Sequence, residues 1–275
     1  MEDVIICKIG GGGVHFIVCI KQVPEGTEVE IDEEKGVLKR EGVESKLNIY
    51  DAYALEAAVR LKERLGGTVT VISMGPPQAA AVIREAYMLG ADAGYLLSDR
   101  KFAGADTLAT SYTLAEAMGH LPPVDVIFCG MQTTDGDTAQ VGPGIAELLG
   151  LPHASYVTEI GAVTDGAIVI DTDMGDGIET LQIDLPCLLT VTKEVNQPRL
   201  PSFRLKMATK DRPISVWGSE ALVGANPDNF GLDGSPTQVE RIFPPPRGRD
   251  REIWQGTGAE LSQRMGAKLK ELKYL

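Results

Sequence analysis

Residues 124–149 read VDVIFCGMQTTDGDTAQVGPGIAELL, and this stretch decides which fold we expect. Its first part, Val124 to Cys129, is apolar and rich in β-branched and aromatic residues, as in a buried strand of a parallel sheet. A polar, glycine-bearing loop runs from Gly130 to Pro143, and a helix-like run follows whose first turn we expect near Thr138. Open parallel sheets bind ligands beyond the carboxyl ends of their strands, where helix N-termini offer unpaired N–H groups. The stretch therefore predicts a strand, a phosphate-binding loop and a helix in succession.

The same alternation of strand and helix runs through the first half of the chain. Apolar, β-branched runs predict strands at 14–20, 68–74 and 93–97. Apolar residues at helical spacing predict helices at 48–65, 78–89 and 106–118. The first of these helices would begin with Asn48 as its N-cap and Asp51 in a capping-box position. Because the connections are short, we predict right-handed βαβ units and a doubly wound, mostly parallel, Rossmann-like α/β sheet.

The pattern changes after Pro152. Short β-branched runs between Gly or Asp turns predict hairpin strands at 156–157, 167–170, 178–183 and 187–191, and a charged excursion at 29–42 fits another short hairpin. From residue 198 to 256, prolines are spread among charged and small residues, which is typical of an extended arm. The arm ends in a predicted amphipathic helix at 258–272, which either folds back onto its own domain or docks on another subunit. We divide the chain into a flexible leader (1–13), an α/β nucleotide-binding domain with the hairpin region (14–197) and a C-terminal arm (198–275).

Composition excludes several classes of partner. The 275 residues include 39 acids and 26 bases, and a net charge of -13 would repel nucleic acid. The cysteines lie far apart at positions 7, 19, 129 and 187, which favours core thiols in a reducing compartment and a cytoplasmic protein. Three dispersed histidines and the absence of a Cys-x-x-Cys pair argue against a metal site. No apolar stretch approaches the ~20 residues of a membrane span.

Three segments would meet at the carboxyl edge of the predicted sheet: 19–23, 74–77 and 130–141, joined by 48–51 at the mouth of the first helix. They offer backbone N–H groups, amides, hydroxyls and two carboxylates, Asp135 and Asp137, but no obvious nucleophile and base, so we assign no catalytic residue. The Asp-Gly-Asp-Thr string also fits a plain tight turn with an N-cap. No P-loop and no Gly-x-Gly-x-x-Gly after a strand are present, which excludes two common nucleotide motifs.

In five places the residues match a known family. These are Cys19-Ile20-Lys21-Gln22-Val23-Pro24, the helix start from Asn48 to Ala58, Ser73-Met74-Gly75-Pro76, Gly104-Ala105-Asp106-Thr107, and the loop from Gly130 to Pro143. Together they resemble the beta subunit of the electron-transferring flavoproteins over about residues 14–210. The second half of the family's signature is present in 179–190, whereas Asp171 and Thr172 stand where a basic residue is usual.

The resemblance implies an adenine-nucleotide site. Carried over residue by residue, it comprises Cys19, Ile20, Lys21, Asn48, Tyr50, Asp51, Met74, Gly75, Gly130, Met131, Gln132, Thr133, Thr134, Asp135, Gly136, Asp137, Thr138, Ala139, Gln140 and Val141. Members with a loop like this one resemble electron-bifurcating flavoproteins, which hold FAD there and take hydride from NADH. Small residues at 136, 139 and 142 would leave room for the flavin. Mitochondrial-type members hold AMP instead, so AMP is the alternative ligand.

The resemblance also implies partners. They are an alpha subunit that carries its own FAD, ferredoxin as an electron acceptor, and an acyl-CoA dehydrogenase or related flavin dehydrogenase. The dehydrogenase would dock on a recognition loop at the start of the arm, with Arg199, Leu200, Phe203 and Leu205 as candidate contacts. The chain would then be the NADH-oxidising part of a multi-subunit complex. The alternatives are a conventional electron carrier with structural AMP and a nucleotide-binding domain with no redox role.

Overall fold

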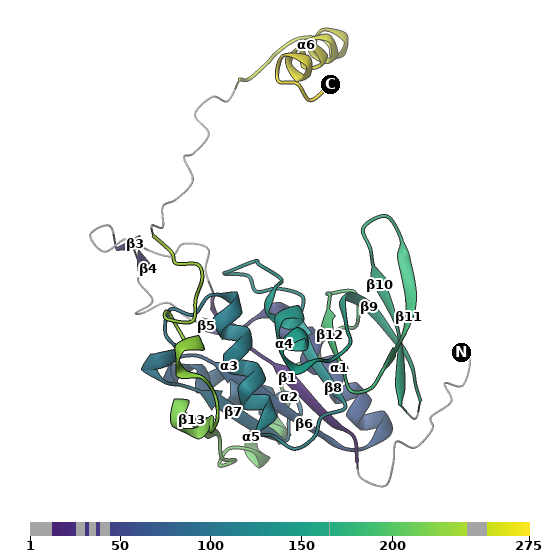
Figure 1. The fold of residues 1–275 in the computed structure, drawn as a ribbon. Coiled ribbons are helices and arrows are strands. Elements are labelled where there is room, and N and C mark those ends of the chain that lie inside the picture. Colours follow the sequence, from purple (N-terminus) through teal and green to yellow (C-terminus); the bar gives the residue numbers. More distant parts are fainter. Residues whose placement is uncertain (1–12, 26–30, 33–36, 39–44, 165, 241–251) are drawn as a thin grey trace.

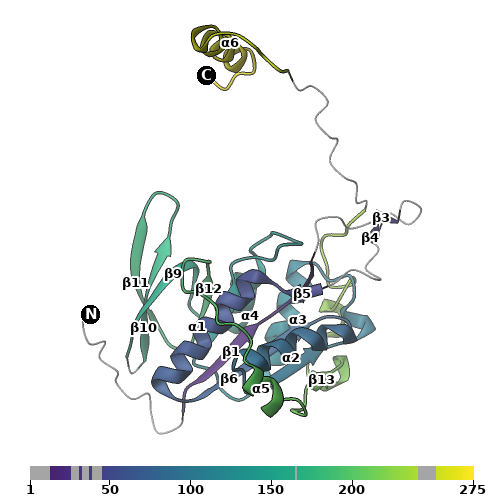
Figure 2. The same cartoon turned by 180° about the vertical axis from the view of Figure 1, so that it is seen from behind.

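The structure is a computed structural model that describes residues 13–25, 31–32, 37–38, 45–164, 166–240 and 252–275. The expected leader falls outside these residues except for Gly13. Figure 1 shows one large sheet with helices on both sides, and Figure 2 shows the same arrangement from behind. The α/β fold class predicted from the sequence is therefore confirmed.

The central sheet has nine strands in the order β11-β10-β9-β12-β8-β1-β6-β7-β13. The seven strands from β9 to β13 in this order pair in parallel, and β10 pairs antiparallel with both β9 and β11. Their bounds are β1 (His15–Cys19), β6 (Thr68–Met74), β7 (Ala93–Leu97), β8 (Val126–Gly130), β9 (His153–Thr164), β10 (Ala167–Asp173), β11 (Ile178–Asp184), β12 (Cys187–Val191) and β13 (Ser215–Trp217). Two short antiparallel pairs stand beside the sheet: β2 (Gln22–Pro24) with β5 (Ser45–Leu47), and β3 (Ile31–Asp32) with β4 (Val37–Leu38).

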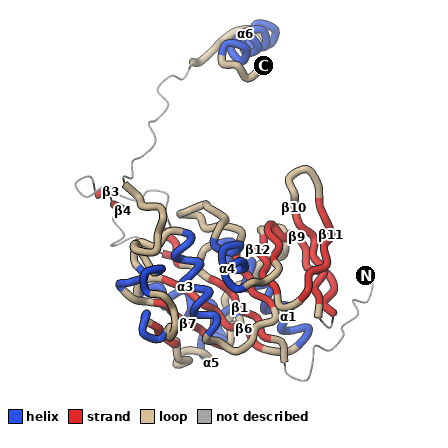
Figure 3. Tube along the Cα trace, in the orientation of Figure 1, coloured by secondary structure: helices blue, strands red, loops and turns tan. Residues whose placement is uncertain are grey.

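Helices cover both faces of the parallel part. On one face lie α1 (Ile49–Leu65) and α2 (Ala80–Leu89), and on the other lie α3 (Thr107–Gly119) and α4 (Val141–Leu149). Two helices follow in the C-terminal part, α5 (Phe203–Ala208) and α6 (Gly258–Glu271). Single turns of 3-10 helix span Pro77–Ala79, Arg100–Phe102, Ser219–Ala221 and Pro227–Asn229. Figure 3 shows the helices in blue and the strands in red.

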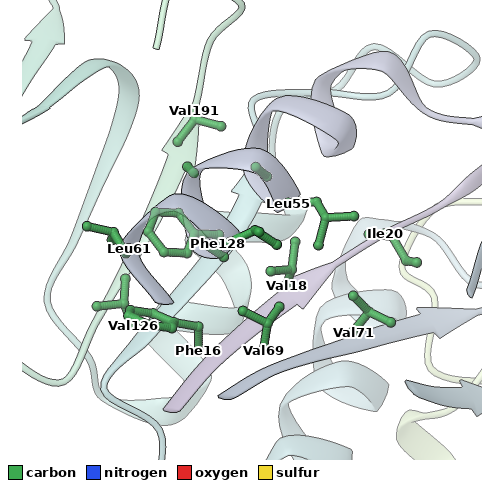
Figure 4. Packing of buried hydrophobic residues seen from close by; sticks show 14 of the residues in the cluster. Phe16, Val18, Ile20, Leu55, Leu61, Val69, Val71, Val126, Phe128 and Val191 are labelled. Carbon is green, nitrogen blue, oxygen red and sulfur yellow. The ribbon is translucent and has the colours of Figure 1, made fainter. Parts of the chain in front are cut away.

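Alternate residues of each central strand point to opposite faces of the sheet, so the fold has two apolar layers. Phe16, Val18 and Phe128 pack under α1, where Leu55 meets them (Figure 4). On the opposite face, Ile17 and Ile127 of the sheet belong to a second apolar cluster with Ile145 of α4. Strands buried on both faces read as continuous apolar runs, which explains why the sequence alone located the parallel strands.

Several predicted helix boundaries move. The helix after the long loop begins at Val141 with Gln140 at its N-cap position, so Thr138 lies before it. Asn48 does occupy the N-cap position of α1, but its side chain makes no cap hydrogen bond. In contrast, Asp106 caps α3 by accepting from the N–H groups of Leu108 and Ala109. Asn48 does not cap because its side chain is bound elsewhere, as shown below.

The hairpin region differs from the prediction in one strand. The segments β9, β10 and β11 form the expected antiparallel meander, which extends from one side of the sheet (Figure 1). The last predicted hairpin strand, β12, instead lies parallel between β9 and β8. Its five residues are all buried, as expected of a strand with neighbours on both edges. The hairpin assignment of residues 187–191 was therefore wrong.

The first part of the predicted arm returns to the domain. Strand β13 pairs in parallel with β7 and extends the sheet, and Phe230 packs in the apolar layer on the α3 side. The helix α6 begins with the capping box of Thr257 and Glu260, and Glu252 of the same segment pairs with Lys268. The division of the chain at residue 198 stays a prediction, with residues 215–217 now part of the sheet.

Candidate functional site

The site lies where the strand order reverses. From β1 the chain proceeds outward to β6 and β7, and then returns to place β8 on the other side of β1. Parallel sheets of this kind bind ligands at the carboxyl ends of the two strands that flank such a switch point. Lys21 follows β1 there, and the loop 130–141 follows β8. Two of the three edge segments predicted from the sequence therefore meet at this switch point.

Asp51 connects the segments that meet at the switch point. Its side chain lies in the first turn of α1 and is 5% exposed. One carboxylate oxygen accepts from the Lys21 backbone N–H at 2.7 Å, and the other accepts from the Asn48 side-chain amide at 2.9 Å. The backbone of Gly130 also hydrogen-bonds to this carboxyl. Asp51 therefore ties the ends of both strands to the start of α1.

Asn48 extends this junction into the loop. It is fully buried, and its Nδ2 also donates to the Gln132 carbonyl at 2.9 Å. Its Oδ1 accepts from the Thr134 N–H at 3.3 Å. The side chain is thus occupied in holding the loop, which is why it does not cap α1. Sequence patterns cannot distinguish these roles, because an Asn before a helix suits both.

Gly130 permits a close approach between β8 and α1. A Cβ atom at this position would lie 2.5 Å from Asp51 Oδ1 and 2.7 Å from the backbone carbon of Tyr50. Such distances are shorter than any real carbon contact, so glycine is required here for packing. Tyr50 consequently lies against the end of β8, at the mouth of the site.

Among the described residues, Lys21 brings a cation to the site. No Lys or Arg occurs between residues 102 and 192, which include the whole loop. The Lys21 Nζ lies 2.8 and 2.9 Å from the two carboxylate oxygens of Asp135. Both side chains are partly exposed, so this pair contributes at most about 1 kcal/mol to stability. The ammonium group can therefore exchange Asp135 for a phosphate at little cost.

The loop itself is a tight, exposed turn. The Asp137 N–H donates to the Thr133 carbonyl at 2.9 Å, and the Gln132 amide hydrogen-bonds to the Asp137 carboxylate. Asp137 and Ala139 both have φ near 56°, in the left-handed region that few non-glycine residues adopt. Thr138 is exposed between them and precedes α4 by three residues. The prediction that Thr138 forms the helix N-terminus was wrong; the first-turn amides belong to Val141 and Gly142.

The small residues of the loop have different surroundings. Within the described part of the chain, a Cβ atom at position 136 would meet only Thr133 Oγ1, at 3.3 Å. At position 142 it would lie 2.5 Å from Thr190 Cγ2 of β12. Gly142 is therefore small so that α4 can pack on the sheet, and it does not leave room for a ligand. Gln140 is tied to α3, where its side chain accepts from Thr107 at 3.0 Å.

The remaining predicted residues lie around the same edge. Cys19 ends β1, and Ile20 is buried just beyond it. Met131 is held by its N–H to the Val191 carbonyl of β12. Met74 ends β6, on the side of β1 away from the loop, and the N–H of Gly75, which follows it, donates to the Leu97 carbonyl. Among the described residues, no hydrogen bond joins Met74 or Gly75 to the loop, so their part in the site stays a prediction.

Electrostatics differ between the two acids closest to Lys21. Burial raises the pKa of Asp51 to about 7, although its hydrogen bonds from Asn48 and Lys21 oppose the shift. Burial acts the same way on Asp135, but the hydrogen bond and the charge of the Lys21 ammonium, together with a hydrogen bond from Thr133, outweigh it and lower the pKa of that carboxyl. The exposed side of the site therefore carries a charged ion pair, and the buried side carries a carboxyl that can hold a proton near neutrality.

The Cys129 thiol, at the end of β8, is hard to ionise. The pKa of Cys129 is raised well above its usual value by a hydrogen bond with Cys19 and by burial.

Across the part of the chain that the structure describes, no three His, Cys, Asp or Glu side chains are placed to hold a metal ion. None of the described helices has the length and apolar character needed to cross a membrane.

A second group of candidate residues lies at the start of the C-terminal part. Leu200 and Phe203 are 88% and 76% exposed, and Leu205 is half-buried in α5. Met207, which the sequence analysis missed, is 59% exposed one turn after Phe203. Arg199 differs from these residues because its guanidinium group is paired with two glutamates of α1.

The chain is similar to several known proteins. Residues 35–222 match the electron transfer flavoprotein domain. The chain is 46% identical over 260 residues to the caffeyl-CoA reductase-Etf complex subunit CarD of Acetobacterium woodii, covering 94% of this chain and 98% of that one. It is 43% identical to the electron transfer flavoprotein subunit beta of Clostridium acetobutylicum, over 95% of this chain and 100% of that one. Protein FixA of Azotobacter vinelandii is 41% identical, over 87% of this chain and 88% of its own length.

Proposed function

This chain belongs to the electron transfer flavoprotein family, as a subunit of the beta type, and from this premise we propose that it is the NADH-oxidising subunit of an electron-bifurcating complex. It binds FAD at the switch point and accepts hydride from NADH. One electron then passes to ferredoxin, and the other passes to the FAD of an alpha subunit that serves a flavin dehydrogenase.

The residues around the switch point fit a nucleotide phosphate. The Lys21 ammonium supplies a positive charge at the mouth. The first turn of α4 adds N–H groups outside the helical ladder and the positive end of the helix dipole. The exposed hydroxyls of Thr134 and Thr138 are further donors in the same loop. A diphosphate would thus be held by donors from both flanking strands.

The observation that carries FAD over AMP is the open position at Gly136. Of the described residues, only Thr133 has an atom near the place of a Cβ there, so this part of the structure leaves space beside the phosphate-binding residues. Bound FAD supplies the isoalloxazine that takes hydride and releases electrons singly. The chain's own residues bind and orient it: Asp51 and Asn48 hold the loop, and Lys21 neutralises phosphate charge.

The C-terminal part supplies the partner contacts in this proposal. The exposed side chains Leu200, Phe203 and Met207 dock an acyl-CoA dehydrogenase or related flavin dehydrogenase. The amphipathic helix α6 docks on the alpha subunit. Since the described cysteines Cys19, Cys129 and Cys187 are free thiols, we propose a cytoplasmic location.

Flavin content tests the proposal most directly. The complex of this chain with its alpha subunit should carry two FAD molecules, and NADH should bleach their absorbance. One FAD plus AMP, with no reduction by NADH, would establish the conventional carrier instead. That alternative has one observation in its favour, because a single lysine at the mouth also suits a single phosphate. A colourless complex would leave a non-redox nucleotide-binding domain.

A further inference from the structure

The segment that leads into α5 is bound along the outer side of α1 and α2. The Asn196 side chain donates to the Tyr53 carbonyl of α1 at 3.0 Å. Arg60 of α1 donates to the Gln197 carbonyl at 2.9 Å. The Ser202 N–H donates to the Met88 carbonyl of α2 at 3.1 Å. These contacts hold the backbone on both sides of residue 199.

Arg199 lies at the centre of this attachment. Its Nε and backbone N–H donate to Glu56 Oε2 at 2.7 and 3.2 Å. Its two terminal nitrogens donate to Glu63 at 2.6 and 3.0 Å. The planar guanidinium group thus bridges two carboxylates that stand two turns apart on α1. A lysine could not do this, because it lacks the fixed fork of donors.

The attachment is charged and half-buried. Glu56 is only 4% exposed, and it also pairs with Arg60. Burial opposes its ionisation, yet the hydrogen bonds from Arg199 and Arg60 lower the pKa of Glu56. Buried charges of this kind are stable only while their partners remain in place. We call Arg199, Glu56 and Glu63 the arginine clamp.

The exposed apolar residues begin immediately after the clamp. Leu200 is the next residue, and Phe203 and Met207 lie four residues apart on one side of α5. Because α5 has only six residues, it cannot hold its own orientation as an isolated helix. Its direction therefore depends on the attachment before it and on packing against α2.

We propose that Arg199 is a positioning residue for partner docking. It does not touch the partner; the clamp fixes the direction in which Leu200 and α5 leave the domain, so that the apolar side chains are presented already ordered. This inference rests on the proposed docking of a flavin dehydrogenase. It also changes the role predicted for Arg199 from the sequence, where it was a candidate contact.

Pre-ordering makes a quantitative difference to binding. A segment that must be ordered on contact costs binding free energy for each side chain and backbone torsion that is fixed. Removing the clamp should therefore raise the concentration of partner needed for half-maximal rate, while the rate at saturation stays unchanged. A residue that served only the stability of the fold would not produce this separation.

The test uses the complex with its alpha subunit and measures electron transfer with the flavin dehydrogenase. Arg199→Gln should raise the KM for the dehydrogenase about tenfold with an unchanged kcat. Arg199→Lys should restore only part of the affinity. Arg64→Gln, which removes a charge from the same helix outside the clamp, should leave KM unchanged. Phe203→Ala should raise KM by loss of a direct contact.

Hydrogen exchange of residues 200–209 then separates positioning from contact. Arg199→Gln should speed exchange of these amides, whereas Phe203→Ala should not. Equal KM values for Arg199→Gln and Arg64→Gln, with Phe203→Ala still impaired, would overturn the clamp and leave the docking site intact. If Phe203→Ala also has no effect on KM, the proposed docking function has failed. Faster exchange in Phe203→Ala than in Arg199→Gln would equally contradict the positioning role.

Discussion

Helix α1 supports two regions of the molecule, and each is organised around a buried carboxyl group. At the N-terminus of the helix, Asp51 is surrounded by backbone and amide N–H groups, and burial raises its pKa to about 7. One turn further, Glu56 faces two guanidinium groups, and its pKa is lowered. Neutral donors only partly replace water around a charge, whereas a cation compensates it directly.

In our proposal, this difference separates the nucleotide-binding edge from the attachment of the docking segment. The proposed nucleotide edge is held by hydrogen bonds from neutral N–H donors to the Asp51 carboxyl group. These bonds leave the Lys21 ammonium group available to a phosphate. The docking segment is held by full charges, and its apolar side chains remain exposed. Two acidic residues on the same helix therefore have different roles, because the rest of the chain brings different partners to each of them.

The most damaging change to the nucleotide edge should be Gly130→Val. The new side chain would overlap Asp51 and the Tyr50 backbone, and neither can move without disrupting the switch point. We expect a loss of at least about 3 kcal/mol in the free energy of unfolding, measured with urea, and no bound nucleotide. Gly136→Val is the matched control: it should keep the fold and lower flavin occupancy. Equal stability of the two variants would contradict the assigned packing.

Removal of the carboxyl at this edge should be nearly as costly. Asp51→Ala leaves the Lys21 N–H and the Asn48 amide without their acceptor, and we expect a loss of about 2 to 3 kcal/mol in urea unfolding. Asp137→Ala, on the exposed turn, should cost less than about 1 kcal/mol. If both variants unfolded alike, the central role of Asp51 in the edge would be refuted.

The two regions should also respond differently to pH. Asp51 has a raised pKa when folded, so above an unfolded pKa near 4 its ionisation costs stability, and this cost grows until about pH 7. Between pH 7 and 5 the Asp51 contribution should therefore increase stability by about 2 kcal/mol. Glu56 has a lowered pKa, so its contribution is retained in this range and is lost only as the pH falls below about 4.5.

Urea unfolding from pH 8 to 4 tests this contrast. Asp51→Asn should flatten the wild-type slope between pH 7 and 5, because the titrating group is gone. The protection factors of the amides of residues 200–209, which correct for the intrinsic pH dependence of exchange, should stay constant over the same range and fall only at lower pH. A wild-type slope that survives in Asp51→Asn would show that another group titrates there.

The smallest expected effects lie within the clamp. Glu56→Gln should cost about 1 to 2 kcal/mol, because it leaves two arginines facing a neutral group in a buried position. Glu63 is more than half exposed, so Glu63→Gln should cost less than about 1 kcal/mol in the same urea assay. A larger loss for Glu63→Gln would mean that the exposed carboxylate, and not the buried one, is the main support.

The fold could be predicted largely because its strands are buried on both faces and therefore carry local signals. The bounds of β6, β7 and β12 match the apolar runs in the sequence. The strands that pair with β12 could not be predicted from local apolar runs, because pairing joins residues far apart along the chain. Its position between β8 and β9 follows from packing of the whole sheet.

The candidate site was predictable in outline for a similar reason. Loops after parallel strands must meet at one edge, so the segments after β1 and β8 could be nominated before any coordinates were known. The individual roles could not. Asn48 reads as a helix cap and Gly142 reads as an open position, yet one holds the loop and the other packs on Thr190.

The alternation of strands and helices, the edge proposed for ligand binding and the family of the chain could all be read from the sequence. These follow from local hydrophobic period and from motifs in fixed order. Only the tertiary structure decided that Asp51 joins two strand ends and that Arg199 binds α1, because each role depends on partners brought together from distant parts of the chain. A carboxyl group acquires its pKa and its function from those neighbours, and a linear pattern does not specify them.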